Sequence, residues 1–570
     1  MDKEGNMTYQ KYYRILCACL LAAILATIVW VLHRCALSKE EVARRDAAAT
    51  DVDWASVVDN PSERLTIHWL GMPNPGGVDG GWIEEQLEAR FNVELCPVIL
   101  DYKGYSTKKP LMFAAGDVPD VILENDPIVL QRDAFHGFLL DIPYEVLREH
   151  APHYVRDLND NAPIGWLYAY WNGRNYGLPT WQEGGGLSVP GVWRADWLQA
   201  VGIDEVPETL EEMHEAFRRF TFDDPDGNGV QDTFGFSGDA QSWWWASFQD
   251  IFGAYGVTPY DWQVTDGRVA WGGVLPEAKE ALALLRQWYA EGLLDPEFVT
   301  DTYGSGKSLD RKLLNGVIGY RAFSAYFNYF DSSNPAGMNN MLQKLNPKGR
   351  FVPGKFPIGP GGRRGGRVWG KGGWIIAFGK HLKDQPEKVV RVLHMLDAMV
   401  VDEDLFLATK YGQRGVHWDY RLPEVGPSGG LMPLPPYDDA NQAQQAMLRF
   451  YNPGENAKFY MKYKTQRKLD FMRQHQNPKW SLTDALGKPD VVPSASQYMG
   501  DLRGRQMTVY AEIIRGDKSL EAFDAFVKEW HSRGGEVMTK EANDMYRMRE
   551  TIYRQVGVNP QTLEAPNEHP

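Results

Sequence analysis

The residues whose types and spacing best predict chemistry lie in one short acidic segment, Asp223–Gly235 (DDPDGNGVQDTFG). Oxygen-bearing side chains alternate along it, and a glycine, Gly229, stands where a calcium loop turns too sharply for a Cβ. The predicted ligands are the side chains of Asp224, Asp226, Asn228 and Asp232 and the main-chain carbonyl of Val230. A hard cation needs several such oxygens converging on one point, so we expect a structural Ca²⁺ site here.

The twelfth position of this loop differs from that of an EF-hand. It is Gly235, whereas an EF-hand has a glutamate there that binds calcium through both carboxylate oxygens. The difference favours a small site that braces the fold over a calcium sensor. The alternative is a turn between two elements that binds no metal.

The composition excludes some functions and favours others. A chain of 570 residues is long enough for about two to four domain-sized units. Its net charge of −15 disfavours a surface for nucleic acid. Twenty tryptophans need either core positions or a ligand that stacks on rings. Only Cys96 lies beyond the N-terminal apolar segment, so no disulfide can form within the main body.

An apolar segment near the N-terminus predicts a transmembrane helix. Residues 15–32 are uncharged and mostly apolar, and a helix of that length spans roughly 27 Å, close to the hydrocarbon thickness of a bilayer. The residues that follow, HRCALSKEE, form a poor signal-peptidase site and no lipobox. We therefore expect an uncleaved anchor between a cytoplasmic tail, 1–14, and a stalk, 33–64. The alternative is secretion after cleavage.

The main body begins with alternating strands and helices. Strands are predicted over 65–70, 93–100 and 121–123, and helices over 82–91 and 107–115. This order predicts a parallel sheet with helices on its faces. Ligands of such sheets bind beyond the carboxyl ends of the strands, which makes the loops 71–81 and 124–127 candidate walls of a site.

Two later helices follow from local signals. Thr209 and Glu212 have the spacing of a capping box, and the helix they predict, 210–220, leads into the acidic segment. A second helix begins at Pro276 and carries one apolar stripe. Trp288 and Tyr289 lie on that stripe, so we expect both in the core.

Several segments, in this order, resemble the extracellular solute-binding proteins of bacterial ABC importers, especially the large oligosaccharide-binding type that includes alginate-binding proteins. The segments are KPLMFAAGDVPDVIL (109–123), NGRNYGLP (172–179), VWRADWLQAVG (192–202), VPETLEEM (206–213), DPDGNGVQDTFGF (224–236), PEAKEALALLRQWYAEGLLDPEF (276–298), NGVIGYRAF (315–323), QPEKVVRVLHMLDAM (385–399), YGQRGVHW (411–418) and IIRGDKSLEAFDAFVKEWHSRGGEVMTKEANDMY (513–546). The resemblance covers nearly all of residues 65–556 and implies an α/β periplasmic-binding-protein fold of two lobes that close on a ligand.

The resemblance also implies the division of the chain and a role for the acidic segment. The first lobe would comprise 65–184 and 368–435, and the second, with the calcium loop, 185–367 and 436–570, with crossings near 180–187, 366–373 and 432–440. In alginate-binding members the corresponding loop holds calcium. An acidic residue commonly follows its last aspartate, where this chain has Thr233.

A sugar site needs flat aromatic faces against C–H-rich ring surfaces and polar groups that reach hydroxyls. Its residues must come from loops at the edges of the lobes, not from the apolar stripes of helices. The candidates are Trp181, Glu183, Gln241, Trp243, Trp244, Arg321 and Trp374. For each of them the alternative is a packing role.

Nothing in the sequence argues for catalysis. A segment similar to a phosphate loop, YGSGKS (303–308), lacks the first glycine of that motif. We expect a membrane-tethered protein, facing the periplasm or the cell exterior, that binds an oligosaccharide by lobe closure and delivers it to an ABC permease. Two alternatives remain: a ligand-sensing ectodomain coupled to a membrane signalling partner, and a polysaccharide lyase or glycosidase.

Overall fold

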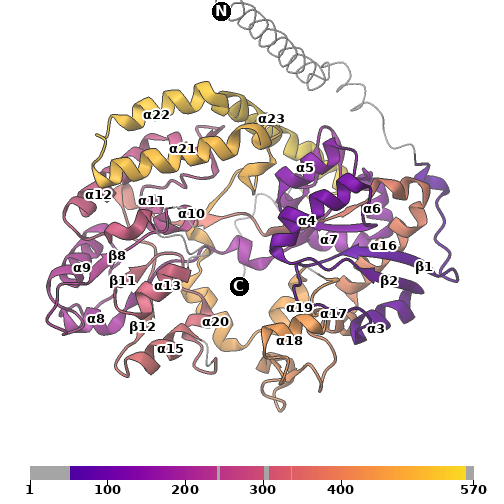
Figure 1. Ribbon diagram of the computed structural model, residues 1–570, viewed down its shortest axis with the longest axis horizontal. Helices are drawn as coiled ribbons and strands as arrows, with labels where there is room; N and C mark the ends of the chain where they lie inside the picture. Colours follow the sequence, from indigo (N-terminus) through magenta and orange to yellow (C-terminus); the bar gives the residue numbers. More distant parts are fainter. Residues whose placement is uncertain (1–51, 241–243, 301–306, 335–336, 453, 560–570) are drawn as a thin grey trace, which may run out of the picture. The chain divides into compact units, whose positions relative to one another are not determined.

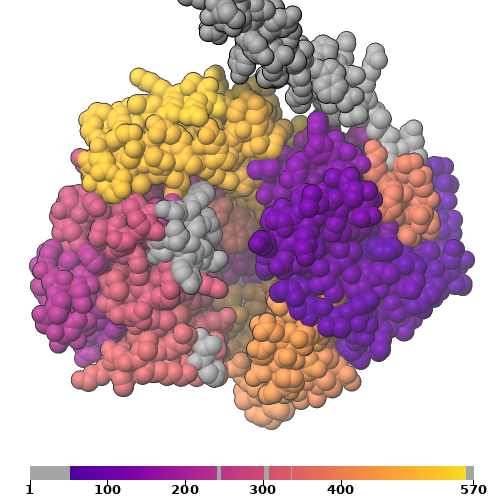
Figure 2. All heavy atoms as spheres, in the orientation of Figure 1, coloured from indigo at the N-terminus to yellow at the C-terminus, as the bar shows by residue number. Residues whose placement is uncertain are grey.

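The computed structural model describes residues 52–240, 244–300, 307–334, 337–452 and 454–559. The unit that begins at Trp54 contains two α/β lobes (Figure 1). The predicted anchor, 15–32, lies outside the described residues, and none of the helices within them is long and apolar enough to cross a membrane. In Figure 2 the surface is hollowed between the first lobe, in indigo, and the second, in magenta and salmon.

The first lobe is built on a five-stranded sheet with the strand order β2-β1-β3-β14-β6. Its strands are β1 (Leu65–Leu70), β2 (Val93–Pro97), β3 (Val121–Glu124), β6 (Leu178–Trp181) and β14 (Gly372–Phe378). β1 pairs in parallel with β2 and β3, as the strand–helix alternation predicts. β14 runs antiparallel to β3 and β6 and so brings a distant part of the chain into this sheet.

Helices cover this sheet and fix the chain segment that enters it. They are α3 (Trp82–Phe91), α4 (Tyr102–Ala115), α5 (Pro127–Phe135), α6 (Tyr144–His150), α7 (Pro152–Asn161), α16 (Pro386–Val401) and α17 (Glu403–Tyr411). Arg391 of α16 is 2% exposed, and its Nε donates to both carboxylate oxygens of Asp59, at 2.8 and 2.9 Å. Its Nη atoms donate to the carbonyls of Asn60 and Phe91, both at 2.6 Å. The segment before β1 is thereby tied to the first lobe.

The second lobe contains a four-stranded sheet with the order β12-β7-β11-β8. Its strands are β7 (Val192–Arg194), β8 (Phe234–Phe236), β11 (Ile318–Arg321) and β12 (Phe351–Pro353). Its helices are α8 (Ala195–Ala200), α9 (Leu210–Phe222), α10 (Trp244–Ser247), α11 (Gln249–Ala254), α12 (Pro276–Ala290), α13 (Lys307–Leu314), α14 (Phe327–Phe330) and α15 (Met338–Leu345). β7 runs antiparallel to β11 and β12, while β8 is parallel to β11.

Two local predictions are confirmed in this lobe. The amide of Glu212 donates to Thr209 Oγ1, and the Glu212 carboxylate accepts from the Thr209 amide, both at 3.1 Å, which is the predicted capping box of α9. Trp288 of α12 is 1% exposed, and its ring packs edge-on against Phe217 and Phe236. The stripe on α12 is therefore core.

The C-terminal helices contact both lobes. They are α21 (Ala495–Arg515), α22 (Ala522–Trp530) and α23 (Glu536–Val556), drawn in yellow in Figure 1. α21 packs against α12 of the second lobe, and α23 packs against α6 of the first lobe and against β10 (Arg268–Trp271). Trp271 stacks on Trp530 with ring centroids 6.2 Å apart. Part of the high tryptophan content is thus explained by packing.

Smaller elements complete the unit. They are β4 (Tyr170–Trp171), β5 (Arg174–Asn175), β9 (Trp262–Thr265), β13 (Gly366–Val368), β15 (Trp418–Tyr420), β16 (Leu431–Pro433), α18 (Ala440–Gln445), α19 (Ala457–Lys462), α20 (Gln466–His475) and β17 (Ser481–Thr483). β13 pairs with β17, β15 with β16, and β4 with β5.

Two connections between the sheets lie side by side. The chain leaves the first sheet after β6 and enters the second at β7, and it returns between β12 and β14. The Gln182 amide donates to the Lys371 carbonyl at 2.8 Å, and the amides of Trp369 and Gly370 donate to the Gly185 carbonyl at 2.9 and 3.0 Å. A Cβ on Gly185 would lie 2.4 Å from the Trp369 indole nitrogen, so this close approach requires glycine.

Candidate ligand-binding site

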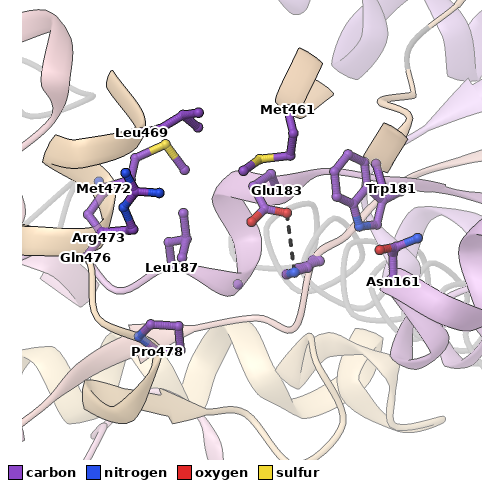
Figure 3. Close-up of a pocket in the computed structure, with 13 residues that line it drawn as sticks. Asn161, Trp181, Glu183, Leu187, Met461, Leu469, Met472, Arg473, Gln476 and Pro478 are labelled. Carbon is purple, nitrogen blue, oxygen red and sulfur yellow. Dashed lines mark ion pairs between the residues drawn. The ribbon is translucent and has the colours of Figure 1, made fainter. Parts of the chain in front are cut away.

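A cavity of about 330 Å³ lies where these two connections meet α19 and α20. Figure 3 shows its side chains arranged around an open centre. The lining residues are Asn161, Trp181, Glu183, Gly186, Leu187, Lys371, Ala457, Met461, Leu469, Met472, Arg473, Gln476 and Pro478. They come from β6, α7, α19, α20 and both connections, so the cavity depends on the packing of distant parts of the chain.

Trp181 forms one end of the cavity, beside Asn161 (Figure 3). It is the last residue of β6 and is 3% exposed. Its ring packs edge-on against that of Tyr460, with centroids 5.6 Å apart. Its Nε1 is buried and has no hydrogen-bond acceptor among the described residues. A buried N–H without an acceptor costs free energy, so this indole is a donor that a ligand could satisfy.

An ion pair occupies the middle of the cavity. The Lys371 ammonium group lies 3.3 Å from the Glu183 carboxylate, and the two side chains are only 10% and 12% exposed (Figure 3, dashed line). The Glu183 amide also donates to the Glu455 carboxylate at 2.7 Å. A Cβ on Gly186 would lie 2.5 Å from the Lys371 side chain, so glycine makes room for the lysine. The pair places charged atoms where sugar hydroxyls could reach them.

The other end of the cavity combines apolar and polar side chains from α20. Leu469 and Met472 lie there with Arg473 and Gln476, and Met461 of α19 closes the top of the view in Figure 3. Thioether and aliphatic groups adapt to the C–H surface of a sugar ring, whereas the guanidinium and amide groups suit hydroxyls. The cavity therefore has the mixed character that a carbohydrate requires.

The structure brings two of the predicted site residues, Trp181 and Glu183, into this cavity. Trp374 is half-buried on β14, where its amide donates to Thr180 Oγ1 at 2.8 Å, and it is not among the described residues that line the cavity. Arg321 is 5% exposed within the second lobe. Its guanidinium donates to the Tyr329 hydroxyl at 2.9 Å, so its contacts are with that lobe.

The remaining predicted ligand residues cannot be placed. Gln241 and Trp243 lie outside the described residues. Trp244 begins α10, but its side chain also lies outside the description.

Sequence reasoning missed Lys371 and the residues from α19 and α20. Lys371 stands in a glycine- and arginine-rich connection and has a φ of +68°, a conformation that its residue type does not predict. Arg473 lies on, and Gln476 directly follows, a short polar helix that resembles any exposed helix in sequence. The one available signal was the predicted crossing near 366–373, because ligand sites tend to lie between lobes.

The acidic segment forms a compact loop directly after α9. The Asn228 amide nitrogen donates to the carboxylates of Asp226 at 3.0 Å and Asp232 at 3.3 Å, and its main-chain N–H donates to Asp224 at 3.1 Å. Gly229 has a φ of +76°, which favours glycine. Thr233 is buried, and its hydroxyl donates to the Phe220 carbonyl at 2.7 Å.

The oxygen atoms of this loop are of the kind that bind calcium, but the structure does not arrange them around one point. In the part of the chain that the structure describes, no three acidic, histidine or cysteine side chains are placed as a metal site. Burial raises the pKa of Asp226, and the nearby charges of Asp224 and Asp232 raise it further. A cation would relieve this repulsion, and the predicted ligands, the side chains of Asp224, Asp226, Asn228 and Asp232 and the Val230 carbonyl, are the groups that would hold it.

A two-lobe fold with a cavity beside the connections that join the lobes is typical of a binding protein that encloses a solute. Residues 78–396 match the family of bacterial extracellular solute-binding proteins, and the chain belongs to this family. The resemblance described above is therefore confirmed.

Particular relatives are distant in sequence. The chain is 24% identical, over 526 residues, to the polygalacturonan/rhamnogalacturonan-binding protein YtcQ of Bacillus subtilis, a match that covers 87% of this chain and 94% of the relative. The fold of this chain is similar to that of the substrate-binding protein FusA of S. pneumoniae in complex with kestose, with a TM-score of 0.61 and 19% identity over 86% of this chain and 100% of FusA. It is also similar to the alginate-binding protein AlgQ2 without calcium ion (TM-score 0.60, 17% identity, 86% and 99% covered).

Proposed function

We propose that this protein binds an oligosaccharide outside the cytoplasm and delivers it to the permease of an ABC importer. The observation that carries the proposal is Trp181, which lines a cavity between the two connections and α20 and has a buried indole N–H without an acceptor among the described residues. The names of two relatives support a carbohydrate: YtcQ is a polygalacturonan/rhamnogalacturonan-binding protein, and FusA was solved with kestose.

The cavity can couple ligand binding to lobe closure. Trp181 belongs to the sheet of the first lobe, while α20 carries Phe471, whose ring contacts Phe327 and Phe330 of the second lobe, with centroids 5.8 and 5.4 Å apart. A ligand that contacts Trp181 and α20 together therefore favours the closed arrangement. The paired connections flank the cavity and would act as the hinge.

We also propose the membrane anchor and the calcium site as parts of this function. The apolar residues 15–32 would tether the protein on the outer face of the membrane, which keeps the ligand near the permease. Fractionation of the full chain against a variant without residues 1–33 tests this, because loss of membrane association is expected only in the variant. A calcium ion in the loop at Asp224–Asp232 would brace the second lobe.

The test of carbohydrate binding is a panel of oligosaccharides offered to the full chain while its thermal unfolding is followed. A ligand that binds the folded state raises the Tm by mass action. Titration calorimetry on each positive sugar then gives its affinity. If no sugar raises the Tm or gives binding heat, the proposed function is wrong.

A further inference from the structure

A second cavity, of about 450 Å³, has a strongly cationic lining. It lies between α14 of the second lobe, the β15–β16 hairpin, and the turn that joins α19 to α20. We call it the basic cavity, and its charged lining residues are Asp331, Arg421, Lys464, Arg467 and Lys468. Asp331 is the one carboxylate among the described residues that line it. This local excess of positive charge contrasts with the net charge of −15 of the whole chain.

Asp331 is shared by the two arginines of the basic cavity. Its carboxylate lies 3.7 Å from the Arg421 guanidinium and 3.9 Å from that of Arg467. Arg467 also donates to Ser332 Oγ and to the Phe330 carbonyl, both at 3.2 Å. The one carboxylate of the lining is thus engaged by the arginines, and the structure shows no ion pair between it and either lysine.

Lys464 and Lys468 are half-buried at one wall of the basic cavity. Within the described residues, neither ammonium group forms an ion pair. Lys464 Nζ lies 2.9 Å from the centroid of the Tyr460 ring, a cation–π contact that fixes its position. Lys464 precedes Thr465, the N-cap of α20, and Lys468 lies in the first turn of that helix, so both ammonium groups line the same cavity.

The surroundings of these lysines disfavour their charge in the absence of a ligand. Burial lowers the pKa of Lys464 to about 7, with Lys468 adding repulsion that Glu455 and Glu183 only partly offset. Burial also lowers the pKa of Lys468, against the attraction of Glu455 and Asp331. A buried ammonium group without a partner is costly, and a bound anion removes that cost.

The basic cavity adjoins the candidate ligand-binding site. Lys468 lines the basic cavity, and the next residue of α20, Leu469, lines the site. The Tyr460 ring contacts one lining residue of each cavity, Trp181 edge-on and Lys464 over its face. A chain of sugars lying against Trp181 can therefore present a substituent to the lysines.

We propose that the ligand is an anionic oligosaccharide, whose carboxylate or sulfate group binds Lys464 and Lys468 in the basic cavity. This inference rests on the proposed function, since it assigns the ligand class of the same site. A neutral sugar leaves both ammonium groups unpaired, whereas an anion pairs them in a region largely withdrawn from water, where the attraction is strong.

The experiment compares sugars that differ in charge but not in length. The full chain is titrated with trigalacturonate, its methyl ester, a sulfated galactose trimer and the neutral galactose trimer. The acid or the sulfated trimer should bind at least about tenfold more tightly than its uncharged counterpart, with an affinity that falls as salt is added. Which of the two binds distinguishes a carboxylate from a sulfate ligand.

Three variants locate the effect. Lys464→Gln and Lys468→Gln should each weaken binding of the anionic trimer at least about fivefold without weakening binding of uncharged trimers. Lys348→Gln removes the same charge from an exposed turn after α15 and should change neither. Neither cavity variant should lower the Tm, because each removes a half-buried charge that forms no ion pair among the described residues.

Equal binding of charged and uncharged trimers overturns the inference and leaves the proposed function intact. If both cavity variants bind the anionic trimer as tightly as the unaltered chain does, the inference is also overturned and the proposed function is left intact. If no trimer or other sugar binds, the proposed function fails with it. The comparison of wild-type ligands needs no variant, so a folding defect cannot hide the answer.

Discussion

The carboxylate of Glu183 lies 3.3 Å from the ammonium group of Lys371, and the two residues belong to the two chain segments that join the sheets. The same ion pair lines the candidate ligand-binding site. One contact therefore holds the connections together and faces the ligand. In the proposed function, closure of the lobes and occupation of the site would act on the same pair of side chains.

Breaking this pair from one side should be costly. Glu183→Gln leaves the Lys371 ammonium group buried without its partner, and we expect a loss of about 3–5 kcal/mol in the free energy of unfolding. The double variant Glu183→Gln/Lys371→Met should recover much of that loss, because no unpaired charge remains. Urea unfolding of both single variants and the double variant measures the coupling. Strictly additive losses would show that the pair is not coupled.

Trp181→Phe should weaken sugar binding and spare stability. It keeps an aromatic ring but removes an N–H that has no acceptor among the described residues, so we expect a loss of about 0.5–1.5 kcal/mol in binding free energy. Trp193→Phe is the matched control, since Trp193 also has a buried, unpaired Nε1 but packs in the second lobe against Phe217 and Tyr320. Calorimetry should separate the two variants; equal affinities would remove Trp181 from the site.

Binding of an anionic sugar should weaken as the pH rises from 6 to 8. Burial lowers the pKa of Lys464 to about 7, so the group is charged below that pH and neutral above it. Lys464→Gln should flatten this dependence. Lys410 has a pKa lowered to about 7 by the same cause, but its Nζ donates to the Asn452 carbonyl, and Lys410→Gln should keep the slope. Affinities of both variants, measured at three pH values, show which of the two lysines causes the pH dependence of binding.

The lowered pKa of Lys464 also predicts how the stability of the ligand-free protein depends on pH. Because its pKa is lowered on folding, the unfolded chain binds more protons than the folded chain above a pH of about 7. The contribution of Lys464 to the free energy of unfolding should therefore increase with pH until the unfolded lysine also loses its proton. The difference between wild type and Lys464→Gln, measured by urea unfolding at pH 7 and 9, should change in that direction. A difference that does not vary with pH would contradict it.

Removal of calcium should lower stability and leave sugar affinity unchanged. A cation offsets the repulsion among Asp224, Asp226 and Asp232, so we expect a higher Tm with Ca²⁺ than with a chelator. Asp226→Asn should abolish that difference. Asp223→Asn, at the end of α9 and outside the ligand set, should preserve it. The same Tm in calcium and in chelator for the unaltered chain would show that the loop is a turn.

Local patterns predicted much of the fold. The strand Leu65–Leu70 and the helix Trp82–Phe91 have the bounds that the sequence indicates. The signals for them, alternating apolar and polar residues and a glycine-rich border, involve only residues close together in the sequence. The capping box of α9 and the core position of Trp288 follow from equally short-range rules. The two-lobe fold followed from the order of motifs, not from any one of them.

The site was only half predictable, for a physical reason. Trp181 and Glu183 stand beside a predicted crossing, where ligand sites tend to lie. Their opposite wall comes from Met472 and Arg473 on α20, which reach the cavity only through tertiary packing. In the acidic loop the sequence predicts which residues converge. It does not predict that Asn228 turns its amide nitrogen toward the carboxylates.

The buried guanidinium of Arg391 has a mechanical consequence. Arg391 is hydrogen-bonded to Asp59 and Asn60, just ahead of β1. A force applied to the chain before residue 59 would therefore be transmitted to α16 before it reaches the sheet. With the membrane anchor proposed above, the tether would hold the first lobe through this contact, and closure on a ligand would move the second lobe relative to it.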